Sequence, residues 1–578
     1  MPDIAPRSAD LRTPQAPIGR VISVRGSQAN LGMPLGGSGI DQLHVTVGNF
    51  VTIRTGRAQL IGVITDISLQ GGEKPDTAVA RLDIVGEIEN ADLSTARFGR
   101  GVKCYPAIGD AATLAGAREL AVIFRQTDTS AIRIGKLQQD EATDAYVDSL
   151  DMLSKHFAVL GTTGVGKSSA VALLLRKTLD VHKDLRIFVL DVHNEYGRCF
   201  GDRAQVLSPK TLKLPFWMFN FEEIVDILFG GKPSSDEEVE ILAELIPQAK
   251  ASYSQYRAGA PSDRPQLKRT EMRATTYSVD NPIPYRIADL LNLIDARMGK
   301  LENRSSRLIH NRLLTRIKTV VDDPRYAFMF ENANVGGDTM AEVFSQIFRL
   351  PTRGVPMTVM QLAGFPAEVV DAVVSILCRL AFDFALWSNG ASPLLFICEE
   401  AHRYAAADRN VGFGPTRRAI SRIAKEGRKY GVFLGLVTQR PAELDPTILS
   451  QCSTLFAMRL TNDRDQAILR SAISDAAADL LDFLPSLGTG EALAFGEGVA
   501  LPMRLRFELL PAALLPRNES LREDTQPGGA IDEAFVASVL DRWRGMSAGA
   551  AETPSPELAP LALDPERFRL LKKQPSES

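Results

Sequence analysis

The sequence contains little cysteine and no paired cysteine motif. Its five cysteines are Cys104, Cys199, Cys378, Cys398 and Cys452. Because their number is odd, their spacing is wide and none stands in a CxxC arrangement, neither a disulfide framework nor a zinc site is indicated. This usage is typical of a reducing compartment, and we expect a cytoplasmic protein.

A long uninterrupted hydrophobic run is also missing. Residues 1–16 lack the apolar stretch of a secretory signal and predict a short flexible arm. The most apolar segment, 369–387, is interrupted by Asp371, Arg379 and Asp383. It therefore predicts a buried amphipathic helix rather than a membrane span, and we expect no membrane partner.

Neither sign of charge is in large excess. The chain has 66 basic and 70 acidic residues, so no chain-wide positive field attracts nucleic acid or anionic lipid. Any such partner would have to meet a local patch. A hydrophobic share of 45% and a charged share of 24% exclude a disordered or collagen-like chain. At 578 residues the chain is too long for one core and predicts several units.

Hydrophobic patterning divides the chain into an all-β region and an α/β region. Between residues 17 and 135, short β-branched runs alternate with turn signals and predict a small β-barrel or sandwich. Residues 136–204 and 351–510 alternate strands with helices, as a parallel α/β sheet does. Residues 205–350 have a helical pattern and predict an insertion that splits this sheet. Residues 511–578 hold a further helix, a Pro-rich linker and a basic tip.

A phosphate-binding motif follows the first strand of the α/β region. The residues GTTGVGKS match GxxxxGK[ST] between an apolar strand and a helix, which is the context that a P-loop requires. The glycines let backbone N–H groups converge on phosphates at the helix N-terminus. We expect Lys167 to neutralise phosphate charge and Ser168 to bind Mg²⁺. The residues predicted to contact the nucleotide are Gly161, Thr162, Thr163, Gly164, Val165, Gly166, Lys167, Ser168 and Ser169.

Carboxylates follow two other apolar strands. Glu399 and Glu400 end the strand LLFIC, and we expect Glu399 to bind Mg²⁺ and Glu400 to polarise the attacking water. Neighbouring side chains of a strand point to opposite sides, although both can turn toward one crevice at its end. A charged strand end at the surface is the alternative. Asp191 and Glu195 follow the strand RIFVLD, and the pattern fits a functional or a structural role equally.

Polar residues near these strand ends have more ambiguous roles. Gln439 follows the strand GVFLGLVT and could sense the γ-phosphate or the attacking water, or be a turn residue. His193 fits a hydrogen-bonded structural residue better than a catalyst. No metal-ligand spacing joins it to His156 or His402.

One segment of this acidic protein is strongly basic. Residues 403–430 contain eight basic and two acidic side chains. On a helix, Arg418, Arg422, Lys425 and Lys429 form one stripe. A solvated face is one interpretation of this stripe. A subunit interface or a nucleic-acid pore is the other.

The ordered series of motifs resembles the HerA family of hexameric DNA translocases, relatives of FtsK in the RecA-like P-loop group. The resemblance covers about residues 15–510, and its pieces are YPAIGD, SKHFAVLGTTGVGKS, DVHNEY, LLFICEEAHRY, ISRIAKEGRKYGV, LVTQRP and FAMRLTNDRDQ. It implies an α/β fold with a RecA-like P-loop ATPase core, an N-terminal β-barrel of the HAS type and an inserted helical bundle. It also implies a C-terminal brace, ATP and Mg²⁺ as cofactors, and a homo-hexamer that passes DNA, as a duplex, through a central channel.

The resemblance assigns roles by position. Asp191 and Glu195 would flank the nucleotide site, Glu400 would be the catalytic acid and Gln439 the sensor. Glu399 stands where the family commonly has Asp, so metal affinity would differ slightly.

A finger that acts on the neighbouring subunit is implied as well, at Arg422, Lys425 or Arg428. Lys425 stands where the family commonly has Arg. Because lysine cannot make the same bidentate phosphate contact, Arg428 or Arg422 is favoured.

A partner protein is implied too. It would be a nuclease of the NurA type or, in bacterial anti-phage defence pairs, a nuclease or a sirtuin-like NAD-consuming effector, docked on the barrel. A different hypothesis is an ATP-regulated oligomeric scaffold that activates its partner without processive translocation. A protein-remodelling AAA-type ATPase would leave the TQRP strand and the helical block unexplained.

Overall fold

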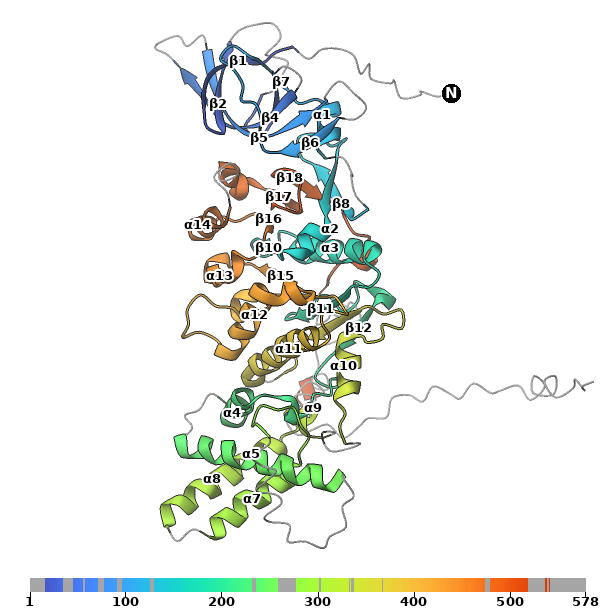
Figure 1. Cartoon of the computed structure of the whole chain (residues 1–578), viewed down its shortest axis with the longest axis vertical. Coiled ribbons are helices and arrows are strands. Elements are labelled where there is room, and N and C mark those ends of the chain that lie inside the picture. Colours follow the sequence, from blue (N-terminus) through green and yellow to red (C-terminus); the bar gives the residue numbers. More distant parts are fainter. Residues whose placement is uncertain are drawn as a thin grey trace, which may run out of the picture.

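The computed structural model describes residues 16–517 with gaps, together with residues 536, 537 and 540. The gaps are 35–44, 56–57, 71–76, 91–95, 125–128, 231–234, 258–276, 301–302, 332, 334–336, 366 and 474–478. The expected flexible arm, and nearly all of the expected C-terminal helix, linker and basic tip, lie outside the described residues. Figure 1 shows an elongated molecule with a barrel at one end, a large sheet in the middle and a helical block at the other end.

The N-terminal region is a closed β-barrel. Its strands are β1 (Gly19–Arg25), β2 (Gln28–Pro34), β3 (Phe50–Thr55), β4 (Ala58–Gln70), β5 (Thr77–Glu89), β6 (Arg97–Arg100) and β7 (Ala111–Leu114). The order β2-β1-β7-β3-β4-β5 closes through pairing of β2 with β5, and β6 extends β5. Leu31, Val51, Leu60 and Leu82 fill the interior, as period-two patterning requires. The closure decides between the predicted barrel and sandwich in favour of the barrel.

The central region is one eleven-stranded sheet. Its strands are β8 (Ala131–Leu137), β9 (Asp144–Asp148), β10 (Phe157–Leu160), β11 (Arg186–Asp191), β12 (Ala204–Leu207), β13 (Met357–Gln361), β14 (Leu394–Cys398), β15 (Val432–Thr438), β16 (Thr454–Ala457), β17 (Glu491–Gly496) and β18 (Met503–Phe507). The order is β12-β13-β11-β14-β15-β10-β16-β17-β18-β8-β9, parallel from β12 to β16 and antiparallel beyond. The helical block is inserted between the neighbours β12 and β13.

The expected limit of the barrel at residue 135 falls inside β8. This strand pairs with β18 in the large sheet, where a Cβ on Gly135 would lie 2.0 Å from the carbonyl oxygen of Arg506. Alternation along a strand shows which side chains are buried but not which sheet the strand joins. The sequence pattern therefore did not separate β8 from the barrel strands before it.

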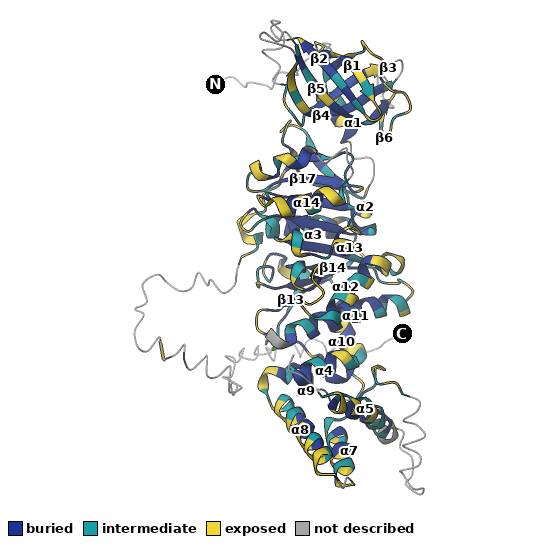
Figure 2. Ribbon diagram, turned by 90° about the vertical axis from the view of Figure 1, so that its left-hand side faces the viewer, coloured by how far each residue is buried: buried dark blue, intermediate teal, exposed yellow. Residues whose placement is uncertain are grey.

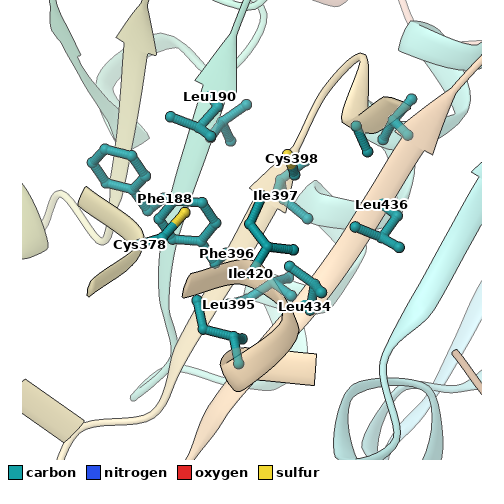
Figure 3. Packing of buried hydrophobic residues seen from close by; sticks show 14 of the residues in the cluster. Phe188, Leu190, Cys378, Leu395, Phe396, Ile397, Cys398, Ile420, Leu434 and Leu436 are labelled. Atoms are coloured by element: carbon teal, nitrogen blue, oxygen red, sulfur yellow. The ribbon is translucent and has the colours of Figure 1, made fainter. Parts of the chain in front are cut away.

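Helices cover the sheet and seal its core (Figure 2). They include α2 (Ser149–Ser154), α3 (Lys167–Val181), α10 (Met340–Phe348), α11 (Ala367–Trp387), α12 (Gly414–Glu426), α13 (Pro446–Leu449) and α14 (Asp463–Ala472), whereas α1 (Ala117–Ile123) lies against β6 of the barrel. Figure 3 shows Phe188 of β11 against Phe396 of β14, with ring centroids 5.2 Å apart, beside Cys378 of α11. These central strands are apolar on both faces because helices cover both. No helix in the described part of the chain has the length and apolarity to cross a membrane.

The helical block follows the predicted periodicity. It contains α4 (Phe221–Phe229), α5 (Asp236–Arg257), α7 (Ile287–Gly299), α8 (Arg304–Val321) and α9 (Ala327–Phe330). A capping box between Asn220 and Glu223 begins α4. The fully buried Glu223 then joins α4 to α11, because it accepts hydrogen bonds from Ser375 (2.8 Å) and Arg379 (2.9 Å). The predicted α/β class, with a β-barrel, a RecA-like core and an inserted helical bundle, is confirmed.

Candidate nucleotide-hydrolysis site

The P-loop connects the end of β10 to the start of α3. Gly164 and Gly166 have φ values of 77° and 100°, in the left-handed region that favours glycine. A Cβ on Gly161 would lie 2.8 Å from the Cβ of Met458, so this position also needs a glycine. The N–H of Thr162 donates to the carbonyl of Arg459 at 3.0 Å. The loop is therefore held by the residues that follow β16, at the carboxyl edge of the sheet.

Lys167 and Ser168 open helix α3 and meet acidic groups from other segments. The ammonium of Lys167 donates to the carbonyl of Thr162 at 2.9 Å, and the hydroxyl of Ser168 donates to Glu195 Oε2 at 2.8 Å. Burial lowers the pKa of Lys167, while nearby acidic groups act in the opposite direction. These groups are Glu400, Glu399 and Glu195. The structure thus gathers the P-loop and the acidic strand ends at one place.

The loop after β11 is organised by Asp191. This buried carboxylate accepts the backbone N–H of Glu195 at 3.0 Å and that of Tyr196 at 2.9 Å. Its oxygens are turned into its own loop, and it is Glu195 that reaches the P-loop. Asp191 therefore shapes the segment that carries Glu195 and Tyr196.

Glu399 is buried beside Tyr196, a residue that the sequence did not single out. The Tyr196 hydroxyl donates to Glu399 Oε1 at 2.9 Å, whereas the buried Oε2 has no hydrogen-bond partner among the described residues. Burial, reinforced by Asp191, raises the pKa of Glu399 well above its usual value, and the hydrogen bond from Tyr196 opposes this rise. No sequence pattern predicts that a buried tyrosine will donate a hydrogen bond to a carboxylate that follows another strand.

Glu400 adopts an unusual backbone conformation that explains how two adjacent glutamates serve one site. Its φ of 48° and ψ of 44° lie in the left-handed region, which costs a non-glycine residue roughly 1–2 kcal/mol. Consecutive residues of a strand would otherwise point to opposite faces. The turn at Glu400 follows β14 and brings both carboxylates close enough to Lys167 to oppose the lowering of its pKa by burial.

Two histidines flank the Glu400 carboxylate. His193 Nε2 lies 3.6 Å from Glu400 Oε1, and His402 Nδ1 lies 3.3 Å from Oε2. His402 Nδ1 is also 2.9 Å from the hydroxyl of Thr438, which accepts the N–H of Arg440 and can donate its own proton to the ring. Burial lowers the pKa of His402 and favours its neutral form, although Glu400 partly offsets this. The structure thus places both histidines beside Glu400, although no spacing in the sequence relates them.

Gln439 approaches the P-loop from the end of β15. This strand pairs with β10, so that Thr438 lies beside Leu160 immediately before the loop. The side-chain oxygen of Gln439 accepts a hydrogen bond from the Thr163 hydroxyl. The amide therefore contacts the loop directly, as a sensor would have to.

The three finger candidates do not lie near the P-loop of their own chain. Helix α12 ends at the amino edge of the sheet, where His156, just before β10, lies 3.0 Å from the carbonyl of Ala424 through Nε2. Burial lowers the pKa of His156 to about 4, and the charge of Arg428 contributes. Lys425 and Arg428 are exposed at this edge, opposite the nucleotide loop.

Arg422 differs from the other two candidates. Its guanidinium lies 3.4 Å from Asp383 and 4.1 Å from the ring centroid of Phe382, both on α11. It is therefore engaged inside the chain, which weighs against its use on a neighbour.

The site residues fit a magnesium nucleotide. Lys167 and the amides of the glycine loop suit phosphate oxygens. The Ser168 hydroxyl and the unpartnered oxygen of Glu399 are hard oxygen donors, of the kind that Mg²⁺ prefers. The carboxylate of Glu400, with one oxygen free of hydrogen bonds within the described chain, suits a water-polarising base.

Comparison with known proteins agrees with this geometry. Residues 132–381 match the model of the family described as Helicase HerA, central domain. A probable helicase of Methanocaldococcus jannaschii is 28% identical over 67% of this chain and 72% of its own length. The DNA double-strand break repair helicases HerA of Sulfolobus acidocaldarius and Pyrococcus furiosus are each 25% identical. They cover 76% and 82% of this chain and 80% and 83% of their own.

Solved structures match the chain at lower similarity. VirB4 of Thermoanaerobacter pseudethanolicus is 15% identical with a TM-score of 0.44, over 67% of this chain and 99% of its own. The bacterial conjugative coupling protein TrwB is 14% identical with a TM-score of 0.42, over 70% and 94%. The matched central domain, the similarity of most of the chain to HerA helicases and the P-loop constellation together identify a P-loop ATPase that is similar to the HerA helicases.

Proposed function

We propose that this protein is an ATP-driven DNA translocase that works as a ring of six and serves a partner effector. The observation that carries the proposal is the meeting of Lys167 and Ser168 with Glu195, Glu399 and Glu400 at one sheet edge. Relatives of similar length are described as DNA double-strand break repair helicases, which supports DNA as the substrate.

In the proposed mechanism, Mg²⁺ and ATP supply the phosphoryl group and the charge that polarises it. Lys167 would neutralise phosphate oxygens, while Ser168 and Glu399 would hold the cation. Glu400 orients the attacking water and takes up its proton. His193, half-exposed beside Glu400, offers that proton a route to solvent.

Strand β15 is proposed to report on the nucleotide. Gln439 contacts Thr163 of the P-loop, and the adjacent Thr438 contacts His402 beside Glu400. Loss of the γ-phosphate would therefore alter the contacts of the Gln439 amide and, through Thr438 and His402, the surroundings of Glu400.

The ring is supported by the placement of the finger candidates. Arg428 and Lys425 are exposed at the edge opposite their own P-loop, where only a neighbouring subunit could use them. Arg428 is the favoured finger, since Arg422 is paired with Asp383 and lysine cannot form the bidentate contact. Hydrolysis would shift neighbouring subunits and move duplex DNA through a central channel.

Each part of the chain has a place in this proposal. The core, which includes β8 and β12 and extends over residues 131–207 and 351–510, hydrolyses ATP. The helical insertion lies between these two parts, and the C-terminal segment 511–578 braces a neighbour. The barrel, whose strands lie between Gly19 and Leu114, docks a nuclease or a sirtuin-like effector in DNA end processing or anti-phage defence. Its loop 101–110 exposes Tyr105 (58%) and Ile108 (75%), side chains suited to a protein interface.

Full-length protein tests the proposal through ATP turnover and displacement of a strand from duplex DNA. We expect duplex DNA to stimulate turnover of the wild type, and Lys167→Ala and Glu400→Gln to abolish turnover and displacement. Glu426→Gln, a matched change at an exposed glutamate on the other sheet edge, keeps both. Retained turnover in Lys167→Ala would overturn the site assignment. Full activity of a co-purified partner with Glu400→Gln would favour the scaffold hypothesis instead.

A further inference from the structure

Helix α8 of the insertion is strongly basic in an otherwise acidic protein. From Arg304 to Val321 it contains four arginines and one lysine and not a single aspartate or glutamate. It lies at the end of the molecule farthest from the barrel (Figure 1). None of the motifs that define the nucleotide site falls within it.

Packing separates α8 into two faces. Leu313, Leu314 and Ile317 are buried against the rest of the helical block. The opposite face exposes the basic side chains Arg304, Arg307, Arg312 and Lys318, which we name the α8 cationic face. Between them this face exposes the uncharged polar residues Asn311, Thr315 and Thr319.

Acidic side chains of the helical block lie on helices other than α8. Helix α5 exposes Asp236, Glu237, Glu240 and Glu244, and Glu244 is paired with Arg297 of α7. No ion pair within the described chain engages Arg304, Arg312 or Lys318. An ordinary solvated face intersperses both signs of charge. Arg304, Arg312 and Lys318 therefore keep their positive charges available for an anionic partner outside the chain.

The length of the face suits a phosphate backbone. Arg304 and Lys318 are fourteen residues apart, or about 21 Å along a helix at 1.5 Å per residue. Phosphates of one DNA strand are spaced about 3.4 Å along the axis, so the face spans about six of them. Arginine predominates, and its planar fork binds phosphate with two hydrogen bonds.

We propose that the α8 cationic face binds the phosphate backbone of duplex DNA. This contact is separate from the nucleotide site and from α12, and it rests on the proposed DNA-translocase function. A membrane surface is disfavoured because the apolar side of α8 is already buried, and the exposed side carries one large apolar residue, Leu308. The face would hold the duplex without reading its sequence, since phosphate contacts carry no base information.

The test compares the full-length wild type with the triple variant Arg304→Gln, Arg312→Gln, Lys318→Gln. A fluorescent duplex is titrated at several salt concentrations, and the slope of log K against log[salt] is measured. Each phosphate contact contributes about −0.9 to this slope, so loss of three should reduce its magnitude by about 2 to 3. Binding should weaken equally for unrelated duplex sequences, while ATP turnover without DNA stays unchanged.

A control with the same change in net charge is Lys210→Gln, Lys213→Gln, Arg353→Gln, at exposed basic residues outside α8. We expect the salt slope of this control to remain that of the wild type. If the α8 variant keeps the wild-type slope and affinity, or loses no more than the control, the proposal is overturned. An acidic protein partner would then be the better candidate. A wild type that binds no duplex at all would instead overturn the proposed function itself.

Discussion

Two helices concentrate positive charge in this protein, and they use it in different ways. On α12, Arg418 pairs with Glu222 of α4, and Arg422 pairs with Asp383 of α11. On α8, the exposed Arg304, Arg312 and Lys318 have no acidic partner in the described structure. Part of the positive charge on α12 is therefore neutralised by ion pairs within the chain, one of which joins the insertion to the core. The unpaired charge on α8 is available to other molecules.

The contrast shows why basic density alone does not identify a binding surface. A sequence reports how many cations a helix carries but not how many are neutralised by residues distant in the chain. Arg418 and Glu222 are nearly two hundred positions apart, and they become neighbours only because α4 and α12 both pack against α11. Exposed pairs of this kind contribute only about 0.2–1 kcal/mol each to stability. Their main consequence is that they neutralise positive charge that could otherwise bind an anionic partner.

The largest expected effect is on ATP turnover, which should depend on Arg428, just after α12, and not on α8. Arg428→Ala should lower the ATPase kcat by about 10³-fold, the lower end of the contribution of a finger arginine. Arg312→Ala on α8 should leave basal turnover unchanged. Steady-state ATP hydrolysis of the assembled protein measures both. If Arg428→Ala turns over normally while Lys425→Ala or Arg422→Ala does not, the finger belongs to that residue instead.

The next effect concerns the anchor beneath α12. Arg379→Ala would leave the fully buried Glu223 without its cation, and a broken buried pair costs about 3 kcal/mol or more. Urea unfolding should show this loss, whereas Arg312→Ala should change the unfolding free energy by less than about 0.5 kcal/mol. Equal losses in the two variants would mean that α8 is as strongly tied to the fold as α11.

The smallest effect depends on pH and lies at the same anchor. Burial raises the pKa of Asp226 on α4 from 3.8 to about 6, and nearby Asp371 of α11 adds to this rise. A carboxyl with a raised folded-state pKa favours the fold while it is protonated, so stability falls as the pH rises from about 4 to about 6.

Asp226→Asn removes this dependence. The variant should be more stable than the wild type by about 1 kcal/mol at about pH 7.5, a figure reduced for partial solvent exposure. The difference should shrink to near zero at about pH 3, below the unfolded-state pKa. Thermal unfolding at the two pH values measures it. A constant difference at both values would show that Asp226 does not titrate in this range.

Much of the nucleotide site could be predicted from the sequence because its motifs are local. The P-loop, the adjacent glutamates after LLFIC and the amide after GLVT each stand at a strand end, and parallel strands bring their carboxyl ends together. Tyr196, His402 and Thr438 could not be found in this way, since their contacts join residues from different strands. The close approach of Glu399 and Glu400 also depends on one left-handed residue, which no periodicity reports.

Fold prediction shows the same division. The β-rich start, the split sheet and the helical insertion follow from period and spacing, but β8 joins the large sheet and not the barrel. For α8, the absence of acidic residues is visible in the sequence, yet its exposure becomes evident only when its apolar side is seen to be buried.

The sequence by itself determined the class of the protein, its phosphate loop and the residue types of its site. These depend on short-range patterns that chain geometry translates directly into strands, helices and a glycine turn. The tertiary structure alone decided which carboxylates face one another, which arginines are neutralised and which remain available. Those outcomes depend on distances between residues far apart in the chain, and electrostatic interactions act through distance in space rather than separation in sequence.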